Sequence, residues 1–215
     1  VKIEAGELST RYRVQIENYL IDLPEFGTAL TPLEADKLAP PVVHRMLEAA
    51  KEAGVGPLAA VAGGIAECVG RGLLEAGHKE IIVENGGDIF LSRSRGLTVS
   101  VYAGQSPLSN RLGLKIVAEQ MPLGICTSSG TVGHSLSFGL ADSVTVLADS
   151  AFVADAAATR LGNEVGSAGE PGKGIERALE VAMSMALLRG VLIVCGAPVG
   201  AVGEMELTPR SGERY

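Results

Sequence analysis

The chain has 215 residues and a formal net charge of −7, from 18 Lys and Arg against 25 Asp and Glu. Hydrophobic residues make up 47% of it and charged residues 20%, which excludes an intrinsically disordered chain. The acidic balance, the lack of Trp and an aromatic content of 4% argue against nucleic acid and against an anionic membrane surface as partners.

The cysteines Cys68, Cys126 and Cys195 lie far apart and form no C-x-x-C pair. Such a sparse, odd count is typical of a reducing compartment. The first residues show no secretory signal, and the longest apolar stretches fall short of the about 20 residues that span a bilayer. The sequence therefore predicts a cytoplasmic protein with no membrane segment, and it leaves a homodimer open.

Helical spacing of apolar residues comes first along the chain and then gives way to a period of two. An Asn-Gly turn between β-branched runs predicts a hairpin over 81–92. Helices are predicted at about 9–23, 40–53, 58–76, 150–162 and 175–189, with a glycine-rich loop at 166–174. Further strands are predicted at about 97–103, 112–118, 123–128, 143–148, 191–195 and 203–208.

This order predicts an α+β fold in a single domain over residues 1–215. Its N-terminal helical part covers about 1–76, and the sheet with two further helices covers about 77–215.

The first segment of unusual composition contains the paired glycines Gly63 and Gly64 and the turn from Asn85 to Asp88. Glycine in a helix costs about 1 kcal/mol relative to Ala, so something must approach this backbone closely. That neighbour is either a ligand or another helix. In the turn, a hairpin alone explains the Asn-Gly-Gly run, and Asp88 is either a turn carboxylate or a site residue.

The second segment, residues 126–139, is rich in hydroxyl residues and glycine. Such a loop can bind a phosphate or another oxyanion through backbone N–H groups and hydroxyls. It lacks the G-x-x-x-x-G-K-[ST] spacing of a Walker A loop. Cys126 and His134 are the candidate catalytic residues, as a thiolate–imidazole pair, and a buried inert thiol is the alternative.

The third segment, residues 150–164, places Asp155 and Thr159 one turn apart on one helix face among small residues. A carboxylate, a hydroxyl and a free carbonyl are hard-oxygen ligands, which suit Mg²⁺ when substrate phosphates and water complete the shell. The alternative is an exposed aspartate on a solvated helix face.

Together, the segments GPLAAVAGGIAECVG, VENGGDIF, CTSSG and SVTVLADSAFVADAAAT resemble motifs of the ApbE-like superfamily, in order and in approximate spacing, over residues 55–162. The chain is most similar to a short cytoplasmic branch of that superfamily, related to FAD:protein FMN transferases. The resemblance implies a T-fold-like architecture in which an antiparallel sheet packs against helices.

The resemblance also implies Mg²⁺ and a flavin, FAD or FMN, as cofactors. It places Mg²⁺ at the side chains of Asp155 and Thr159 and at the carbonyl groups of Ala158 and Ala66. The residues that it assigns to the flavin site are Asn85, Gly86, Gly87, Asp88, Thr127, Ser128, Ser129 and Gly130.

Two parts of the transferase signature are missing. The K-G-x-x-x-D run after Gly-Gly-Ile-Ala is replaced by a run that begins with Glu67 and Cys68, and no H-I-I-D-P-R-T-G is present. We therefore predict that protein flavinylation is absent or very weak.

Two readings of the function follow. In one, the chain is a Mg²⁺-dependent transferase or hydrolase that acts on a flavin nucleotide or another phosphate-containing substrate. In the other, it binds a small nucleotide or anion without turnover, as an accessory protein in anaerobic sulfur and homocysteine metabolism. Cys126 would be the sulfur carrier in the second reading.

Overall fold

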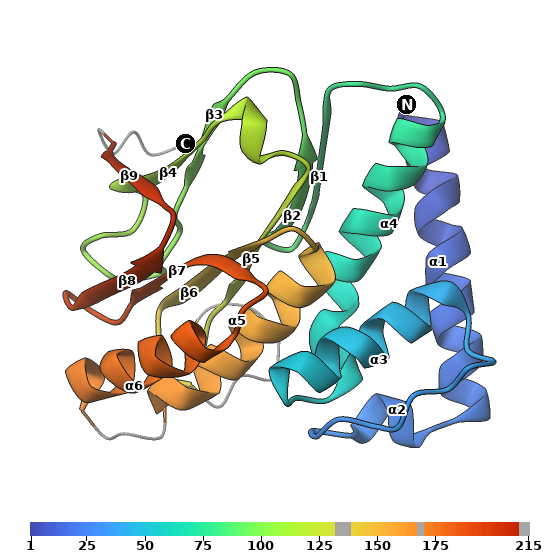
Figure 1. Cartoon of the computed structure of the whole chain (residues 1–215), viewed down its shortest axis with the longest axis horizontal. Coiled ribbons are helices and arrows are strands. Elements are labelled where there is room, and N and C mark those ends of the chain that lie inside the picture. Colours follow the sequence, from blue (N-terminus) through green and yellow to red (C-terminus); the bar gives the residue numbers. More distant parts are fainter. Residues whose placement is uncertain (132–138, 167–169, 211–215) are drawn as a thin grey trace.

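Helices fill the first third of the chain in the computed structural model, which describes residues 1–131, 139–166 and 170–210 (Figure 1). Pro41 at the first turn and Gly54, with a left-handed φ of 71°, bound the third helix as predicted. These elements are α1 (Lys2–Asp22), α2 (Glu25–Thr28), α3 (Pro41–Ala53), the short 3₁₀ helix η1 (Pro57–Ala60) and α4 (Val61–Glu75).

The first helix begins earlier than the predicted residue 9. Its first turns are held by Ala5 and Leu8, which pack with Tyr12 against a buried cluster of Val69, Leu73 and Ile81. Tertiary packing of this kind outweighs the low helix propensity of Gly6 and Ser9.

The main sheet has six strands in the order β1-β2-β5-β6-β7-β8, and every neighbouring pair is antiparallel. Gly86 and Gly87, both with positive φ, form the predicted hairpin turn between β1 and β2. The strands of this sheet are β1 (Ile81–Asn85), β2 (Asp88–Ser92), β5 (Leu123–Ser128), β6 (Ser143–Ala148), β7 (Leu188–Val194) and β8 (Val199–Gly203).

A smaller antiparallel sheet has the order β3-β4-β9, formed by β3 (Leu97–Ser100), β4 (Leu112–Ile116) and β9 (Glu206–Pro209). The single strand predicted at 203–208 is therefore wrong. Gly203, with φ of 92°, ends β8 in the main sheet, and the chain then turns to add β9 to the smaller sheet.

Helices α5 (Ala151–Gly166) and α6 (Pro171–Ser184) cover one face of the main sheet, and the smaller sheet covers the other (Figure 1). The prediction ended α6 at 189, whereas β7 already begins at Leu188. Between the two sheets lies a cluster of large apolar side chains that includes Leu91, Leu114 and Ile125. The predicted α+β class, with an antiparallel sheet packed against helices, is confirmed.

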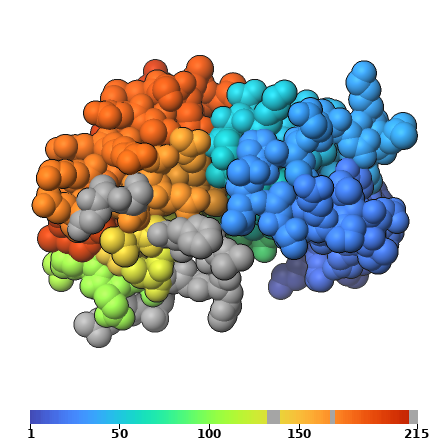
Figure 2. All heavy atoms as spheres, turned by 90° about the horizontal axis from the view of Figure 1, so that it is seen from below, coloured from blue at the N-terminus to red at the C-terminus, as the bar shows by residue number. Residues whose placement is uncertain are grey.

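The N-terminal helices extend the helical layer sideways. Figure 2 shows them, blue to cyan, on one side of the molecule and α6, orange, on the other. Within this layer α4 packs between α1 and α5. The stretch Pro57–Glu75 is long and apolar enough to cross a membrane by length and composition alone. Of its most apolar 18 residues, 56% are buried in the molecule, as in a core helix.

The paired glycines of α4 are explained by close helix packing. A Cβ at Gly63 would lie 2.4 Å from the carbonyl oxygen of Ala151, and one at Gly64 would lie 2.5 Å from the ring of Phe152. Both neighbours belong to α5. Of the two alternatives, the structure favours another helix over a ligand.

Candidate functional site

A cavity of about 810 Å³ opens where the β1–β2 turn, the end of β5 and the start of β6 meet. Strands β3 and β4 form its opposite wall, and α5 reaches it through Asp155 and Thr159. We call it the acidic cavity. The polar side chains among its lining residues are Glu84, Asp88, Ser100, Tyr102, Thr127, Ser128, Ser129, Asp142, Thr145, Asp155 and Thr159.

Charge is the distinctive property of this cavity. Four of the lining side chains are carboxylates, and none of the lining residues in the described part of the chain is Lys, Arg or His. Carboxylates that share a desolvated site repel one another unless a cation neutralises them. Such a cavity attracts cations or keeps some of its carboxyl groups protonated.

Asp88 is buried, with 7% of its surface exposed, although it directly follows the hairpin turn. Its Oδ1 accepts the backbone N–H of Thr127 at 3.1 Å, so it ties β2 to β5. Burial raises the pKa of Asp88 to about 7; the nearby Glu84 adds to the shift, and the Thr127 N–H opposes it. The hairpin alone does not explain this residue.

Asp155 is half-buried, and its Oδ2 accepts the backbone N–H of Gly63 at 2.8 Å. Desolvation and the charge of Asp88 raise the pKa of Asp155 well above its usual range, although backbone N–H groups of Gly63 and Ala62 lower it. The alternative of an aspartate on a solvated helix face is excluded, because the side chain lies at the cavity and bonds to α4.

Hydroxyl groups from neighbouring strands line the cavity beside the carboxylates. Thr127 Oγ1 on β5 lies 3.0 Å from Thr145 Oγ1 on β6, and Thr145 Oγ1 lies 3.2 Å from Ser143 Oγ. Ser128 and Ser129 continue the row at the end of β5. These groups can donate hydrogen bonds to an anion or accept them from a ligand.

Four of the residues predicted to bind flavin or Mg²⁺ do not line the cavity. Asn85 donates from Nδ2 to the carbonyl of Ala62 at 3.1 Å, and Gly130 N–H donates to the carbonyl of Ala141. Ala66 and Ala158 are fully buried in the main core. Their parts in flavin or Mg²⁺ binding stay predictions, and His134 lies outside the described residues.

Cys126 is fully buried between the two aspartates and the start of α5. Its Sγ donates to the carbonyl of Ala151 at 3.4 Å. Burial and the charges of Asp88 and Asp155 raise the pKa of the thiol well above its usual value. A nucleophile or sulfur carrier needs an accessible thiolate, so these surroundings are those of a structural cysteine.

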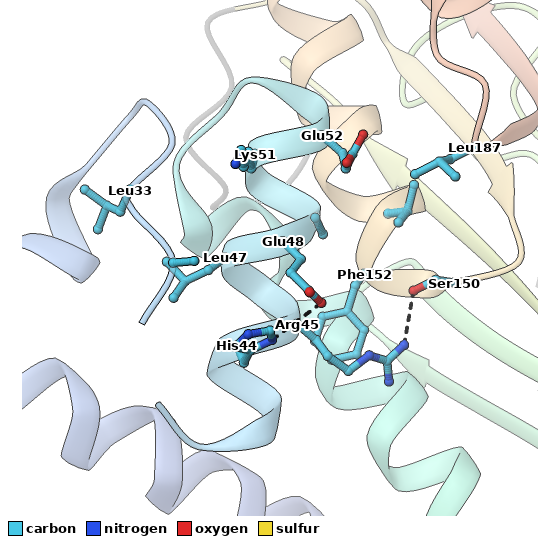
Figure 3. A pocket seen from close by; sticks show the side chains of 13 residues that line it. Leu33, His44, Arg45, Leu47, Glu48, Lys51, Glu52, Ser150, Phe152 and Leu187 are labelled. Atoms are coloured by element: carbon cyan, nitrogen blue, oxygen red, sulfur yellow. Dashed lines mark hydrogen bonds and ion pairs between the residues drawn. The ribbon is translucent and has the colours of Figure 1, made fainter. Parts of the chain in front are cut away.

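A second hollow of about 490 Å³ lies between α3 and the start of α5 (Figure 3). At its floor the guanidinium of Arg45 lies over the ring of Phe152, 4.2 Å from the centroid, and Nη2 lies 3.4 Å from Ser150 Oγ. Behind Arg45 the carboxylate of Glu67 is fully buried. The surroundings of Glu67 differ from those of the carboxylates in the acidic cavity, because Arg45 and Arg71 both pair with Glu67.

Sequence reasoning missed Glu84, Asp142 and Thr145 as residues that line the cavity. It also missed the structural role of Glu67. A signal existed for Thr145, which is the one polar residue inside the apolar run Val144–Ala148. Asp142 immediately precedes the same strand, where it accepts Gly196 N–H at 2.6 Å. Glu67 offered little local signal, since only Arg71, four residues later on α4, is a local partner. Its other partners, Arg45, Ser150 and Ala151, are distant in the sequence.

The model of the family described as "AbpE bacteria" matches residues 1–204. The chain belongs to this family. It is 43% identical over 206 residues to a UPF0280 protein of Methanococcus aeolicus, which covers 95% of this chain and 82% of the relative. A UPF0280 protein of Methanosarcina acetivorans is 41% identical over 214 residues, which cover 99% and 83% of the two chains.

Among solved structures, the ApbE protein of Thermotoga maritima is similar with a TM-score of 0.52 and 15% identity. The match covers 68% of this chain and 50% of the Thermotoga protein, so this chain spans half of that longer protein. This likeness shows a shared fold. Together with the family match it confirms the resemblance that the motifs indicate.

Proposed function

We propose that the acidic cavity binds a phosphate-containing small molecule together with Mg²⁺, and that a flavin nucleotide is the first candidate. The observation that carries the proposal is four carboxylates beside a row of hydroxyls, with no Lys, Arg or His among the described lining residues. Where these carboxyl groups are ionised, they repel a phosphate, because like charges at short range in a desolvated cavity repel strongly. A divalent cation removes that repulsion.

The residues at the cavity fit a hard cation. Asp155 and Thr159, at i and i+4 on α5, present a carboxylate and a hydroxyl to the same space. The described residues contain no group of three or more His, Cys, Asp or Glu that could hold a metal by itself. Mg²⁺ commonly binds through one or two carboxylates while substrate phosphates and water complete its shell. When bound, it would neutralise phosphate oxygens.

The opposite wall of the cavity supports a nucleotide rather than a bare phosphate. Val99 and Leu114 of the smaller sheet, and Val101 directly after β3, lie opposite Ile89 and Ile125 of the main sheet. An apolar wall next to a polar end suits a ligand with a planar ring and a charged tail. The resemblance to ApbE-like transferases places a flavin first among such ligands.

Isothermal titration of the full chain with FAD, FMN, ADP and ATP, each with and without Mg²⁺, tests the proposal. We expect at least one of them to bind with Mg²⁺ and to lose most of its affinity without it. Asp155→Asn, which is nearly isosteric, is the matched control and should abolish the Mg²⁺ dependence. No binding of any of the four below millimolar concentration would contradict the proposal.

Group transfer is a separate question from binding. Because the K-G-x-x-x-D and H-I-I-D-P-R-T-G elements are missing, we expect no more than trace flavinylation of a protein acceptor. The protein, FAD, Mg²⁺ and an acceptor domain are incubated, and covalent flavin is read by in-gel fluorescence. A strong covalent band would show that those elements are dispensable in this branch.

A further inference from the structure

The buried carboxylate of Glu67 accepts hydrogen bonds from four groups on three elements of the fold. Its Oε1 accepts from Arg45 Nη2 at 2.6 Å and Arg71 Nε at 2.7 Å. Its Oε2 accepts from Ser150 Oγ at 2.9 Å and from the backbone N–H of Ala151 at 2.7 Å. Every lone-pair direction of the carboxylate therefore has a donor.

The bond to Ala151 matters most, because Ala151 is the first residue of α5. The first N–H groups of a helix have no partner within it, and a carboxylate there also interacts favourably with the helix dipole. Glu67 thus caps α5 from another helix. Ser150 precedes α5, yet its hydroxyl donates to Glu67.

Helices α4 and α5 are joined by two polar bridges, one turn apart on each helix. Gly63 N–H donates to Asp155, and Glu67 accepts from Ala151. Gly63 and Glu67 are four residues apart on α4, and Ala151 and Asp155 are four residues apart on α5. The pairs run in opposite order, so the two bridges fix one antiparallel register between the helices.

We propose that Glu67 is a positioning residue for the acidic cavity: by holding Ala151 it sets the register of α5 against α4 and so places Asp155 and Thr159 at the cavity. Glu67 is not among the residues that line the cavity. It acts on the site through α5, whose stiff backbone transmits a displacement of Ala151 to Asp155 one turn further on.

The packing around Ala151 leaves the start of α5 little freedom. A Cβ at Gly124 of β5 would lie 2.5 Å from the Cα and N of Ala151, and one at Gly63 would lie 2.4 Å from its carbonyl oxygen. Close backbone contacts resist compression but not separation. The carboxylate of Glu67 supplies attraction in the direction that those contacts leave open.

The test compares Glu67→Gln with Glu164→Gln in the full chain. Glu164 is the control, since it also pairs with two arginines, Arg160 and Arg177. It is 13% exposed and lies on the later part of α5, outside the cavity lining. Native-state amide exchange by NMR reports on Gly63, whose N–H lies in the first turn of α4 and bonds to Asp155. Gly70, later in α4, reports on the rest of that helix.

In Glu67→Gln we expect the exchange of the Gly63 amide to accelerate about tenfold more than that of Gly70. In Glu164→Gln the two amides should change by the same factor. Equal acceleration of both amides in Glu67→Gln, or none at Gly63, would mean that Glu67 contributes stability alone and would overturn the proposal. If Glu67→Gln does not fold, Ser150→Ala removes one of the four donors. It should accelerate the exchange of the Gly63 amide about threefold more than that of Gly70.

A second measurement uses Mn²⁺ alone as a spectroscopic probe, read by electron paramagnetic resonance, and rests on the proposed function. We expect Glu67→Gln to bind Mn²⁺ about tenfold more weakly and Glu164→Gln to match the wild type. Unchanged affinity in Glu67→Gln, with binding that Asp155→Asn abolishes, would overturn the positioning of the cation site. If the wild type binds no Mn²⁺, either alone or in the presence of FAD or ADP, the proposed function fails, and the Gly63 exchange still decides the inference about Glu67.

Discussion

Glu67 and Asp88 are both buried carboxylates, yet their pKa values move in opposite directions. Burial raises the pKa of both. At Glu67 the hydrogen bonds and charges of Arg45 and Arg71 outweigh burial, and the pKa is lowered. At Asp88 burial outweighs the hydrogen bonds from the Thr127 N–H and from Cys126, and the charge of Glu84 raises the pKa further.

This difference in pKa makes the acidic cavity a better candidate for a functional site than the surroundings of Glu67. A buried carboxylate without a cation costs free energy, and the chain shows at Glu67 that it can provide two arginines. At the acidic cavity none of the described lining residues supplies a positive charge. Unneutralised carboxylates in a cavity are typical of sites that bind a cation or transfer a proton.

Replacing Asp155 should have the largest effect on binding. Asp155→Asn removes a full negative charge next to a divalent cation, so Mg²⁺-dependent ligand binding should weaken by an amount on the order of several kcal/mol. The helix should remain intact, because the side chains are nearly isosteric. Titration calorimetry measures the affinity, and circular dichroism checks the fold. A wild-type Mg²⁺ response in the variant would remove Asp155 from the site.

The pH dependence of stability should show that Asp88 is buried without a cationic partner among the described cavity residues. Its pKa is raised to about 7 in the folded chain, so the folded state binds the proton more tightly than the unfolded state. The wild type should therefore lose stability relative to Asp88→Asn as the pH rises from about 4 to about 7, by at most about 4 kcal/mol, and no further above that.

Urea unfolding of both proteins at a series of pH values, without divalent cations, measures this difference. Adding Mg²⁺ at pH 7.5 should restore part of the wild-type stability and leave Asp88→Asn less affected. A difference that does not change between pH 4 and 7 would show that Asp88 is already compensated in the folded state.

Local rules predicted most of the fold. The hairpin at Asn85–Asp88 needs positive φ at Gly86 and Gly87, and α3 needs only Pro41 and Gly54 at its ends, so each could be read from a short window. The division of the C-terminal stretch between β8 and β9 could not be predicted from a short window. It depends on β9 pairing with β4, some 90 residues earlier in the chain.

The candidate site also contains residues that local sequence patterns could predict, and its surroundings contain one that they could not. Asp155, Thr159 and the Thr127–Ser129 run stood out because polar or small residues occupied positions where a helix or strand rarely needs them. Glu67 read only as a departure from the transferase motif. Its importance comes from Arg45, Arg71 and the start of α5, and the contact with Ala151 spans 84 residues. No local pattern encodes such a contact.

Removing one arginine should leave the charge of Glu67 less well neutralised and so bring its surroundings closer to those of Asp88. Arg45→Met keeps an apolar side chain against Phe152 but leaves the buried carboxylate with Arg71 as its remaining cation. We expect the free energy of unfolding to fall by about 2 kcal/mol. This is less than for a fully buried pair, because Arg45 is 36% exposed and Arg71 still pairs with Glu67. Arg13→Met, which breaks the exposed pair with Glu17, should change it by less than about 0.5 kcal/mol. Equal losses in the two variants would contradict the comparison.

Replacing Thr159 should have the smallest effect and tests whether the cavity holds its cation through oxygen ligands beyond the carboxylate. Thr159→Val removes one neutral oxygen and keeps the shape, so Mg²⁺-dependent binding should weaken by about 1 kcal/mol, much less than in Asp155→Asn. Thr159→Ser keeps the hydroxyl and should restore most of the affinity. If the serine variant binds as weakly as the valine variant, the methyl group and its packing on α5 are what matter, and Thr159 is not a ligand.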